Sequence, residues 1–309
     1  MTKGQMLRQR LKPWMLPIAM VGGILFHGQI AYVGFLTPYL IFAMLLITFC
    51  RIDRRDFHLS GMMGWLLLVQ LAGSVGLYLA LRGLSVDVAQ AVFICVLCPT
   101  ATAAPVVTGM LGGSVTRLVA YSLLSNVTIA LVAPALLAWI GPGDVDLAAA
   151  TVSIACNVGP LILGPLVAAF LLKGVMPKVH HEIASRQAVS FYIWAVSLFI
   201  VVGKSVSFIM SEPASKVPEI VVMAIAAGLA CAGQFLIGRR IGRRYGDPIS
   251  GAQGLGQKNT VLAIWLALTY LNPISSVGPA AYIAWQNTIN SIQLYLKQRR
   301  DLQAAVNKN

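Results

Sequence analysis

Long apolar runs alternate with short polar breaks along the chain, and this pattern predicts ten membrane-spanning helices. A helix needs about 20 mostly apolar residues to cross the hydrocarbon core of a bilayer. Runs of roughly this length lie at 14–28, 31–50, 62–81, 87–110, 116–140, 147–172, 187–210, 218–238, 250–271 and 277–296. The sequence therefore predicts an all-α polytopic membrane protein, in which a single transmembrane domain takes up residues 1–309.

The composition supports this class. Apolar residues make up 58% of the chain and charged residues only 11%, whereas a soluble domain normally has about a quarter of its residues charged. This balance argues against a water-soluble enzyme, a disordered chain and a fibrous repeat.

The basic residues lie in short clusters between apolar runs. Their positions indicate whether a nucleic-acid partner is expected and which membrane topology the chain has. The net charge is +13, but the clusters follow no single face and no aromatic stacking platform, so we expect no nucleic-acid partner. With a cytoplasmic N-terminus, 19 Lys and Arg fall in cytoplasmic loops and tails and two, Arg82 and Lys216, in outside loops. The positive-inside rule then favours a multi-pass protein of the cell inner membrane with both termini cytoplasmic.

None of the ten carboxylates falls in the middle of a predicted span. We therefore expect no proton or sodium relay that depends on a buried Asp or Glu. No carboxylate pair, zinc-ligand spacing or nucleophile with a nearby histidine lies at membrane depth, so the sequence predicts neither an enzyme nor a bound metal or other cofactor.

Two of the predicted spans contain helix-breaking polar stretches. In the fourth, Pro99 and Pro105 enclose the sequence Thr-Ala-Thr-Ala-Ala, and each proline removes a backbone donor and clashes with the preceding turn. In the ninth, Gly254 and Gly256 precede Gln257-Lys258-Asn259-Thr260. Non-helical backbone at this depth is tolerated only where it lines a cavity or is buried in protein, so both stretches are candidate sites.

The two breaks fall at corresponding places in two halves of the chain. The fourth and ninth spans occupy equivalent positions in repeats of about 14–140 and 147–296. The next span of each half carries a polar motif, Ser125-Asn126 in one and Gln286-Asn287-Thr288 in the other. Paired interruptions of this kind indicate an inverted-repeat secondary transporter whose substrate binds near the midplane.

Simpler interpretations of these polar residues stay open. A proline can kink a transmembrane helix without any ligand nearby. The three asparagines Asn126, Asn287 and Asn290 could also form hydrogen bonds between helices. Lys204, in the seventh span, could simply extend its amine toward the membrane surface.

Lys258 is the strongest single candidate. A buried ammonium is costly in the membrane unless it is paired or loses its proton, and no acidic residue lies at the same depth. Its partner could be carbonyl and amide oxygens of the unwound segments or a bound anion, and the amine could also be neutral. Half-helix N-termini attract anions as well, so an anionic substrate is the hypothesis that explains most.

Along nearly its whole length the chain resembles the bile acid:sodium symporter family. The shared motifs are Phe35-Leu36-Thr37-Pro38-Tyr39-Leu40 with Phe42 and Met44, Cys98-Pro99, Gln257 to Thr260, and Trp285-Gln286-Asn287. The resemblance implies a panel of helices one, two, six and seven beside a core of helices three to five and eight to ten, whose relative motion gives alternating access. It also implies an organic anion as substrate, such as a bile acid, a steroid sulfate or pantoate, and places Thr102, Asn259 and Asn287 at the substrate site.

The chain departs from this family where the family binds sodium. Ala104-Pro105 stand where the family has a Ser-Asn pair, and Gly254 and Lys258 where it has Glu and Gln. We therefore predict a sodium-independent or proton-linked carrier, in which the Lys258 ammonium replaces a cation or neutralises the substrate.

Taken together, the sequence predicts a transporter of an organic anion, either bile acid-like or a small carboxylate. The expected substrate-binding residues are Thr102, Lys258, Asn259 and Asn287, and those expected to shape the unwound segments are Pro99, Pro105, Gly254, Gly256 and Gln257. Besides its substrate, the expected partner is the lipid bilayer. The oligomeric state stays open, as does a second function, a non-transporting membrane sensor or scaffold with the same fold.

Overall fold

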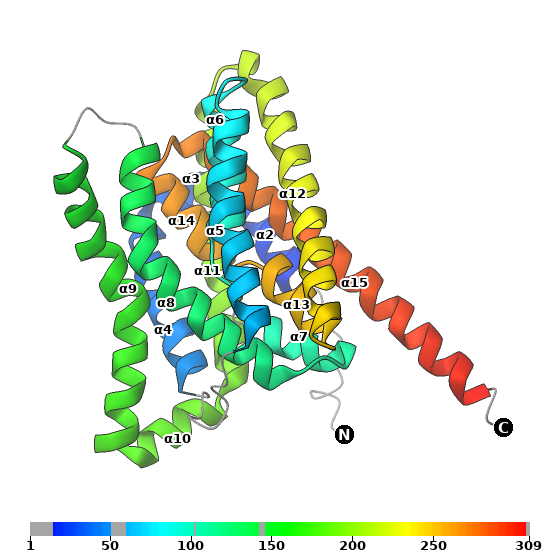
Figure 1. Cartoon of the computed structure of the whole chain (residues 1–309). Helices are drawn as coiled ribbons and strands as arrows, with labels where there is room; N and C mark the ends of the chain where they lie inside the picture. The colour runs from blue at the N-terminus through cyan, green and yellow to red at the C-terminus, as the bar shows by residue number, and fades with distance from the viewer. Residues whose placement is uncertain (1–14, 51–59, 102, 142–145, 307–309) are drawn as a thin grey trace. The chain divides into compact units, whose positions relative to one another are not determined.

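A computed structural model describes residues 15–50, 60–101, 103–141 and 146–306 (Figure 1). These described residues form helices joined by short turns and contain no β-strand. The all-α class that the hydrophobic pattern predicts is therefore confirmed.

Six helical segments of the described chain are long and apolar enough to cross a membrane. They are Tyr32–Phe49, Gly61–Leu81, Val115–Ile140, Leu147–Val175, Tyr192–Ser211 and Ala214–Arg244. Two shorter apolar helices, Val86–Leu97 and Thr260–Tyr270, belong to the interrupted fourth and ninth spans. The protein is thus a helical membrane protein, and the count of ten spans stays a prediction.

The chain packs as two compact units, each made of two separate segments. The first consists of Met1–Arg51 and Pro160–Lys216, and the second of Ile52–Gly159 and Val217–Asn309. One long helix, α9 (Leu147–Val175), contributes its beginning to the second unit and its end to the first.

In the first unit, a long helix packs against the elements near the N-terminus. These elements are α2 (Met15–Leu25), α3 (His27–Ile30), the 3₁₀ helix η2 (Ala31–Leu36) and α4 (Thr37–Phe49), and the long helix is α11 (Gln187–Ser211). Glycines allow α2 and α11 to approach closely, because a Cβ added at Gly203 would lie 2.9 Å from the carbonyl oxygen of Gly23. Two elements of this unit, α10 (Pro177–Ser185) and the 3₁₀ helix η4 (Ala214–Lys216), lie in segments that the hydrophobic pattern predicts as loops between spans.

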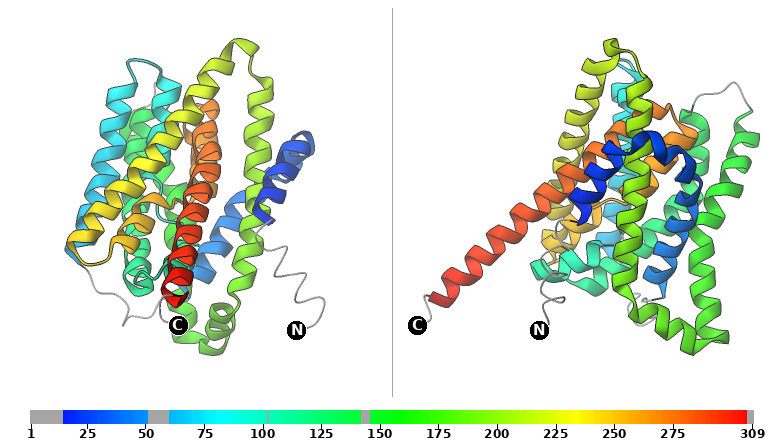
Figure 2. Two further views of the ribbon diagram at one scale, coloured as in Figure 1. Left: turned by 90° about the vertical axis from the view of Figure 1, so that its right-hand side faces the viewer. Right: turned by 180° about the vertical axis from the view of Figure 1, so that it is seen from behind.

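The second unit contains both interrupted helices. Its elements are α5 (Gly61–Leu81), α6 (Val86–Leu97), α7 (Ala104–Leu111), α8 (Val115–Ile140), α12 (Val217–Arg244), α13 (Pro248–Gly256), α14 (Thr260–Tyr270), η5 (Pro273–Ser276) and α15 (Val277–Val306). The C-terminal ends of α12 and α15 point to the same side of the unit (Figure 2). The helix α6 is buried on all sides from Val88 to Leu97, so the first interrupted helix runs through the middle of its unit.

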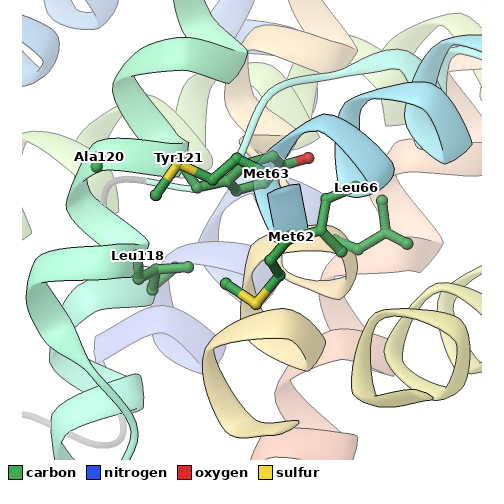
Figure 3. Packing of buried hydrophobic residues seen from close by; sticks show 8 residues of the cluster. Met62, Met63, Leu66, Leu118, Ala120 and Tyr121 are labelled. Atoms are coloured by element: carbon green, nitrogen blue, oxygen red, sulfur yellow. The ribbon is translucent and has the colours of Figure 1, made fainter. Parts of the chain in front are cut away.

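A cluster of apolar side chains joins α5 to α8 beside the interrupted helices. Met62, Met63 and Leu66 of α5 lie against Leu118 and Tyr121 of α8, and all five are at most 1% exposed (Figure 3). Leu255 of α13 belongs to the same cluster. The packing therefore fixes the end of α13 against two uninterrupted helices.

The contact between α12 and α13 is a contact between backbones. A Cβ added at Gly238 of α12 would lie 2.2 Å from the carbonyl oxygen of Gly251 on α13, and one added at Gly242 would lie 2.3 Å from the carbonyl oxygen of Asp247. Real Cβ atoms do not come this close to a carbonyl oxygen. Small residues that permit such an approach are typical of helix interfaces in membranes.

Local sequence explains where the half-helices begin and end. The Ser85 hydroxyl accepts a hydrogen bond from the Val88 N–H and caps α6, which ends just before Pro99. Pro105 lies in the first turn of α7, where a missing N–H has no cost because the first turn has no helical acceptor. The side-chain oxygen of Asn259 accepts from the Leu262 N–H at 3.3 Å and caps α14.

Candidate functional site

The two unwound segments run antiparallel and pair with each other through their backbones. The pairing is a single bridge between Thr100 and Lys258. Its two hydrogen bonds measure 2.9 Å each, from the Ala101 N–H to the Gln257 carbonyl and from the Asn259 N–H to the Pro99 carbonyl. Each break therefore satisfies backbone groups that the other leaves without a helical partner.

The structure confirms an interruption in each of the two predicted spans, but it corrects the extent of the second one. Gly254 and Gly256 lie inside α13, which stays helical up to Gly256. Their effect on the crossing is through packing. A Cβ at Gly254 would lie 2.9 Å from Cδ1 of Tyr121, and one at Gly256 would lie 2.5 Å from Cγ of Phe235, so both positions need a residue without a side chain.

The Lys258 side chain connects one broken helix to the other. It is 1% exposed, and its Nζ donates a hydrogen bond of 2.8 Å to the Val96 carbonyl oxygen in the last turn of α6. The carbonyls of a last turn have no helical donor and carry partial negative charge. Among the possible partners that the sequence left open, the one found in the described residues is thus a carbonyl oxygen of the other broken helix.

The backbone of Lys258 is held from a third element. Its N–H donates to Oε1 of Gln286 on α15 at 2.9 Å. Thr100 completes the crossing, because its hydroxyl donates to the Gly254 carbonyl at 2.7 Å. Both the side chain and the backbone at position 258 are therefore fixed in one place.

A buried glutamine, Gln70 on α5, closes the C-terminal end of α6. Its Nε2 donates to the carbonyls of Leu97 and Cys98 at 2.6 and 3.0 Å. Its Oε1 accepts from the Tyr121 hydroxyl at 2.8 Å and from the Ser125 hydroxyl at 3.1 Å. All polar atoms of this amide therefore serve to hold the broken end of one half-helix.

A glutamine and a tyrosine hold the end of α13 in a similar way. The Tyr282 hydroxyl on α15 donates to the Gly256 carbonyl at 2.8 Å and accepts from Nε2 of Gln234 on α12 at 2.9 Å. Neither Gln70 nor Gln234 is among the residues that the sequence predicts for the site. The signal that could have found them is a single amide in an otherwise apolar span, at 62–81 and again at 218–238.

The N-terminal ends of α6 and α13 are also held in place. A residue just after α14 contacts the start of α6, and a residue in the turn after α7 contacts the start of α13. The Asp87 carboxylate in the first turn of α6 accepts from Nδ2 of Asn272, just after α14, at 2.5 Å. The Asp247 carboxylate caps α13 by accepting from the Ser250 N–H at 3.0 Å. It also accepts from the Ser114 N–H, in the turn after α7, at 3.3 Å.

Among the residues that the structure describes, three buried polar atoms next to the crossing have no hydrogen-bond partner. They are Oε1 of Gln257, Nδ2 of Asn259 and Oγ1 of Thr260, in residues that are all at most 3% exposed. Buried polar groups normally have a partner. The crossing thus offers an acceptor, a donor and a hydroxyl to a molecule that would bind there.

The expected substrate residues are only partly brought together. Lys258 and Asn259 lie at the crossing, whereas Asn287 is half-buried and follows Gln286 on α15. Thr102 lies outside the described residues. Pro99, Pro105 and Gln257 flank or form the unwound segments, as the preceding contacts describe.

Two other asparagines have different surroundings. Asn290 on α15 accepts from Nε2 of Gln253 on α13 at 2.9 Å, which is the interhelical hydrogen bond expected as one alternative. Asn126 donates to the Ser122 carbonyl of its own helix at 2.8 Å. Among the residues that the structure describes, no three His, Cys, Asp or Glu side chains gather where they could hold a metal ion.

The chain was also compared with known proteins. No model of a known protein family matches it, and no curated protein does.

Proposed function

We propose that the protein is a secondary transporter that carries an organic anion by alternating access around the crossing of its two broken helices. The observation that carries this proposal is the paired unwound backbone of Thr100 and Lys258 in the middle of the second unit. Discontinuous helices whose unwound parts meet are the common form of a substrate site in secondary transporters.

The arrangement of the half-helices favours an anionic substrate. The C-terminal end of α6 faces the Lys258 ammonium and the Gln70 amide, so its negative partial charge is already compensated. The N-terminal end of α14 begins at Thr260, beside the unpartnered donor of Asn259. A helix N-terminus attracts anions, and a carboxylate or sulfate there would accept hydrogen bonds from Asn259 and Thr260, with Thr102 and Asn287 contributing further contacts.

Corresponding contacts in the two halves support the proposed inverted repeats of about 14–140 and 147–296. In the first half Gln70 donates to the end of α6 and accepts from Tyr121. In the second half Tyr282 donates to the end of α13 and accepts from Gln234, so each end is held by a glutamine–tyrosine pair with the two roles exchanged. The two compact units support a division into a panel and a core. In this proposal the core holds the crossing and moves relative to the panel during transport, as the resemblance to the bile acid:sodium symporter family implies.

In the same proposal Lys258 is a tethered cation. Sodium would bind carbonyl oxygens at broken helix ends, and the Lys258 ammonium already donates to one, that of Val96. A positive charge that belongs to the chain needs no ion from solution, so transport should proceed equally in sodium and in potassium.

Uptake into proteoliposomes tests this proposal. Purified full-length protein is reconstituted, and the uptake of labelled taurocholate and of labelled pantoate is measured under sodium and under potassium gradients. Wild type is compared with Lys258→Gln and with Lys204→Gln, which removes a half-buried lysine of the first unit. We expect uptake of at least one anion by the wild type and by the Lys204 variant in both salts, and a loss or a new sodium requirement for Lys258→Gln.

Two results would contradict the proposal. Uptake by the wild type that needs sodium would overturn the tethered-cation role, although the transporter function would stand. An absence of both uptake and counterflow with every anion, from protein that is folded in the vesicles, would favour a sensor or scaffold instead.

A further inference from the structure

The C-terminal parts of α12 and α15 separate from each other (Figures 1 and 2), and Arg239, Arg243 and Arg300 lie on these parts of the two helices. Arg239 is half-buried on α12, and its Nη2 donates to Oε1 of Gln293 on α15 at 3.1 Å. Arg243 follows Arg239 by one turn of α12, and Arg300 follows Gln293 by about two turns of α15, so both lie on the same sides of their helices as the contacting pair. The positive-inside pattern predicts that this end of both helices is cytoplasmic.

None of the ion pairs between described side chains involves Arg239, Arg243 or Arg300. The side chain of Asp301, which follows Arg300, lies outside the described residues. Like charges on neighbouring helix turns repel each other, so an anion bound among the three arginines would reduce this repulsion.

Next to the arginines, the same two helices present apolar side chains on their surface. These are Leu236 and Ile237 on α12 and Ile292, Tyr295 and Leu296 on α15, which are 41–62% exposed. Along each helix these apolar residues come before the basic ones, and they therefore lie nearer to the apolar part of the span. A molecule that fits both features has an anionic head and an apolar tail.

We propose that Arg239, Arg243 and Arg300 bind the phosphate of an anionic phospholipid whose acyl chains lie against the exposed apolar residues of α12 and α15. Guanidinium groups bind phosphate oxygens in a bidentate manner, and basic pockets between transmembrane helices are suited to anionic headgroups. This lipid site is separate from the crossing, and it would exist whether or not the protein is a transporter.

Lipid binding to purified full-length protein tests the site. Delipidated protein in a neutral detergent is titrated with phosphatidylglycerol or phosphatidylcholine, and bound lipid is counted by native mass spectrometry. Inorganic phosphate and glycerol phosphate are titrated in parallel, with the melting midpoint as readout, to separate a lipid site from a site for a free anion. We expect phosphatidylglycerol to be retained in preference to phosphatidylcholine, and the two soluble phosphates to leave the melting midpoint unchanged.

Charge-matched variants locate the site. The test variant is Arg239→Gln with Arg300→Gln, and the control is Arg240→Gln with Arg299→Gln, which removes the same charge from neighbouring exposed positions of the same helices. Each arginine near a phosphate contributes about fivefold in affinity, so the test variant should bind phosphatidylglycerol about 25-fold more weakly and the control should bind it like the wild type.

If the test variant does not fold, Arg300→Gln alone is used, because Arg300 is exposed; it should bind about fivefold more weakly. Equal losses in the test and control variants would overturn the site and show a general effect of charge. Equal binding of both phospholipids, or equal stabilisation by inorganic phosphate, would overturn it as a site for an anionic lipid.

Discussion

The Nζ of Lys258 donates a hydrogen bond of 2.8 Å to the carbonyl oxygen of Val96, which lies 162 residues earlier in the chain. This contact places the buried amine of Lys258 against the open C-terminal end of a half-helix, where partial negative charge accumulates. It also ties the ninth predicted span to the fourth. Substitutions in this part of the second unit should therefore have measurable effects on stability and function.

Replacing Lys258 by Met should separate stability from function. Methionine removes the desolvation cost of the buried amine but leaves the Val96 carbonyl without its donor, and these two effects oppose each other. Because the side-chain volume changes little, the melting midpoint in detergent should therefore change little. Uptake of the anion should fall about tenfold or more, because the charge at the crossing is lost. Lys204→Met is the matched control and should change neither quantity, and unchanged uptake by Lys258→Met would rule out a functional role for the charge.

Replacing Gln70 by Leu should destabilise the second unit. The change leaves the carbonyls of Leu97 and Cys98 and the Tyr121 hydroxyl without their partners, at an expected cost of about 3 kcal/mol in total. The melting midpoint in detergent should fall accordingly. Tyr121→Phe removes only the hydroxyl and should cost about 1 kcal/mol, while Gln29→Leu changes an exposed glutamine of the first unit and should have no effect. An equal effect of all three would contradict the role of Gln70.

Replacing Gly251 by Ala should separate α13 from α12. The added Cβ would lie 2.3 Å from the Gly238 carbonyl oxygen, and a backbone atom cannot rotate away as a side chain can. We expect a loss of about 2–3 kcal/mol, measured as a lower melting midpoint. Gly233→Ala on the same helix α12 meets no atom within 4 Å and should be neutral or stabilising, because alanine favours a helix over glycine. A tolerated Gly251→Ala would show that the two helices can move apart freely.

Replacing Asp247 should distinguish a helix cap from an ion pair. Asp247→Ala removes the acceptor for the N–H groups of Ser250 and Ser114, with an expected cost of about 2 kcal/mol. Asp247→Asn keeps one acceptor oxygen for the Ser250 N–H that caps α13. It loses the hydrogen bond from the Ser114 N–H and the 3.9 Å ion pair with Arg117, whose side chain is 47% exposed, so the free energy of unfolding should fall by only about 1 kcal/mol. A loss as large as that of Asp247→Ala would instead assign the effect to the Ser114 contact and the charge.

The helical membrane class and the places where two spans are interrupted could both be predicted from the sequence. Both follow from local chemistry. A bilayer accepts only apolar helices of sufficient length, and Pro99 and the polar run after Gly256 cannot continue a helix without loss. Lys258 was identified from the sequence for the same reason, since an amine in an apolar span is costly wherever it lies.

Which groups meet at the crossing could be learned only from the folded arrangement of the helices. The partners of Lys258 and of Gln70 belong to other helices, and hydrogen bonds between distant residues leave no periodic pattern in a sequence. The role of Gly254 and Gly256 was misjudged because glycine is consistent both with an unwound backbone and with close packing. The choice depends on whether Tyr121 and Phe235 lie against them, and that is set by the packing of α8 and α12 around α13.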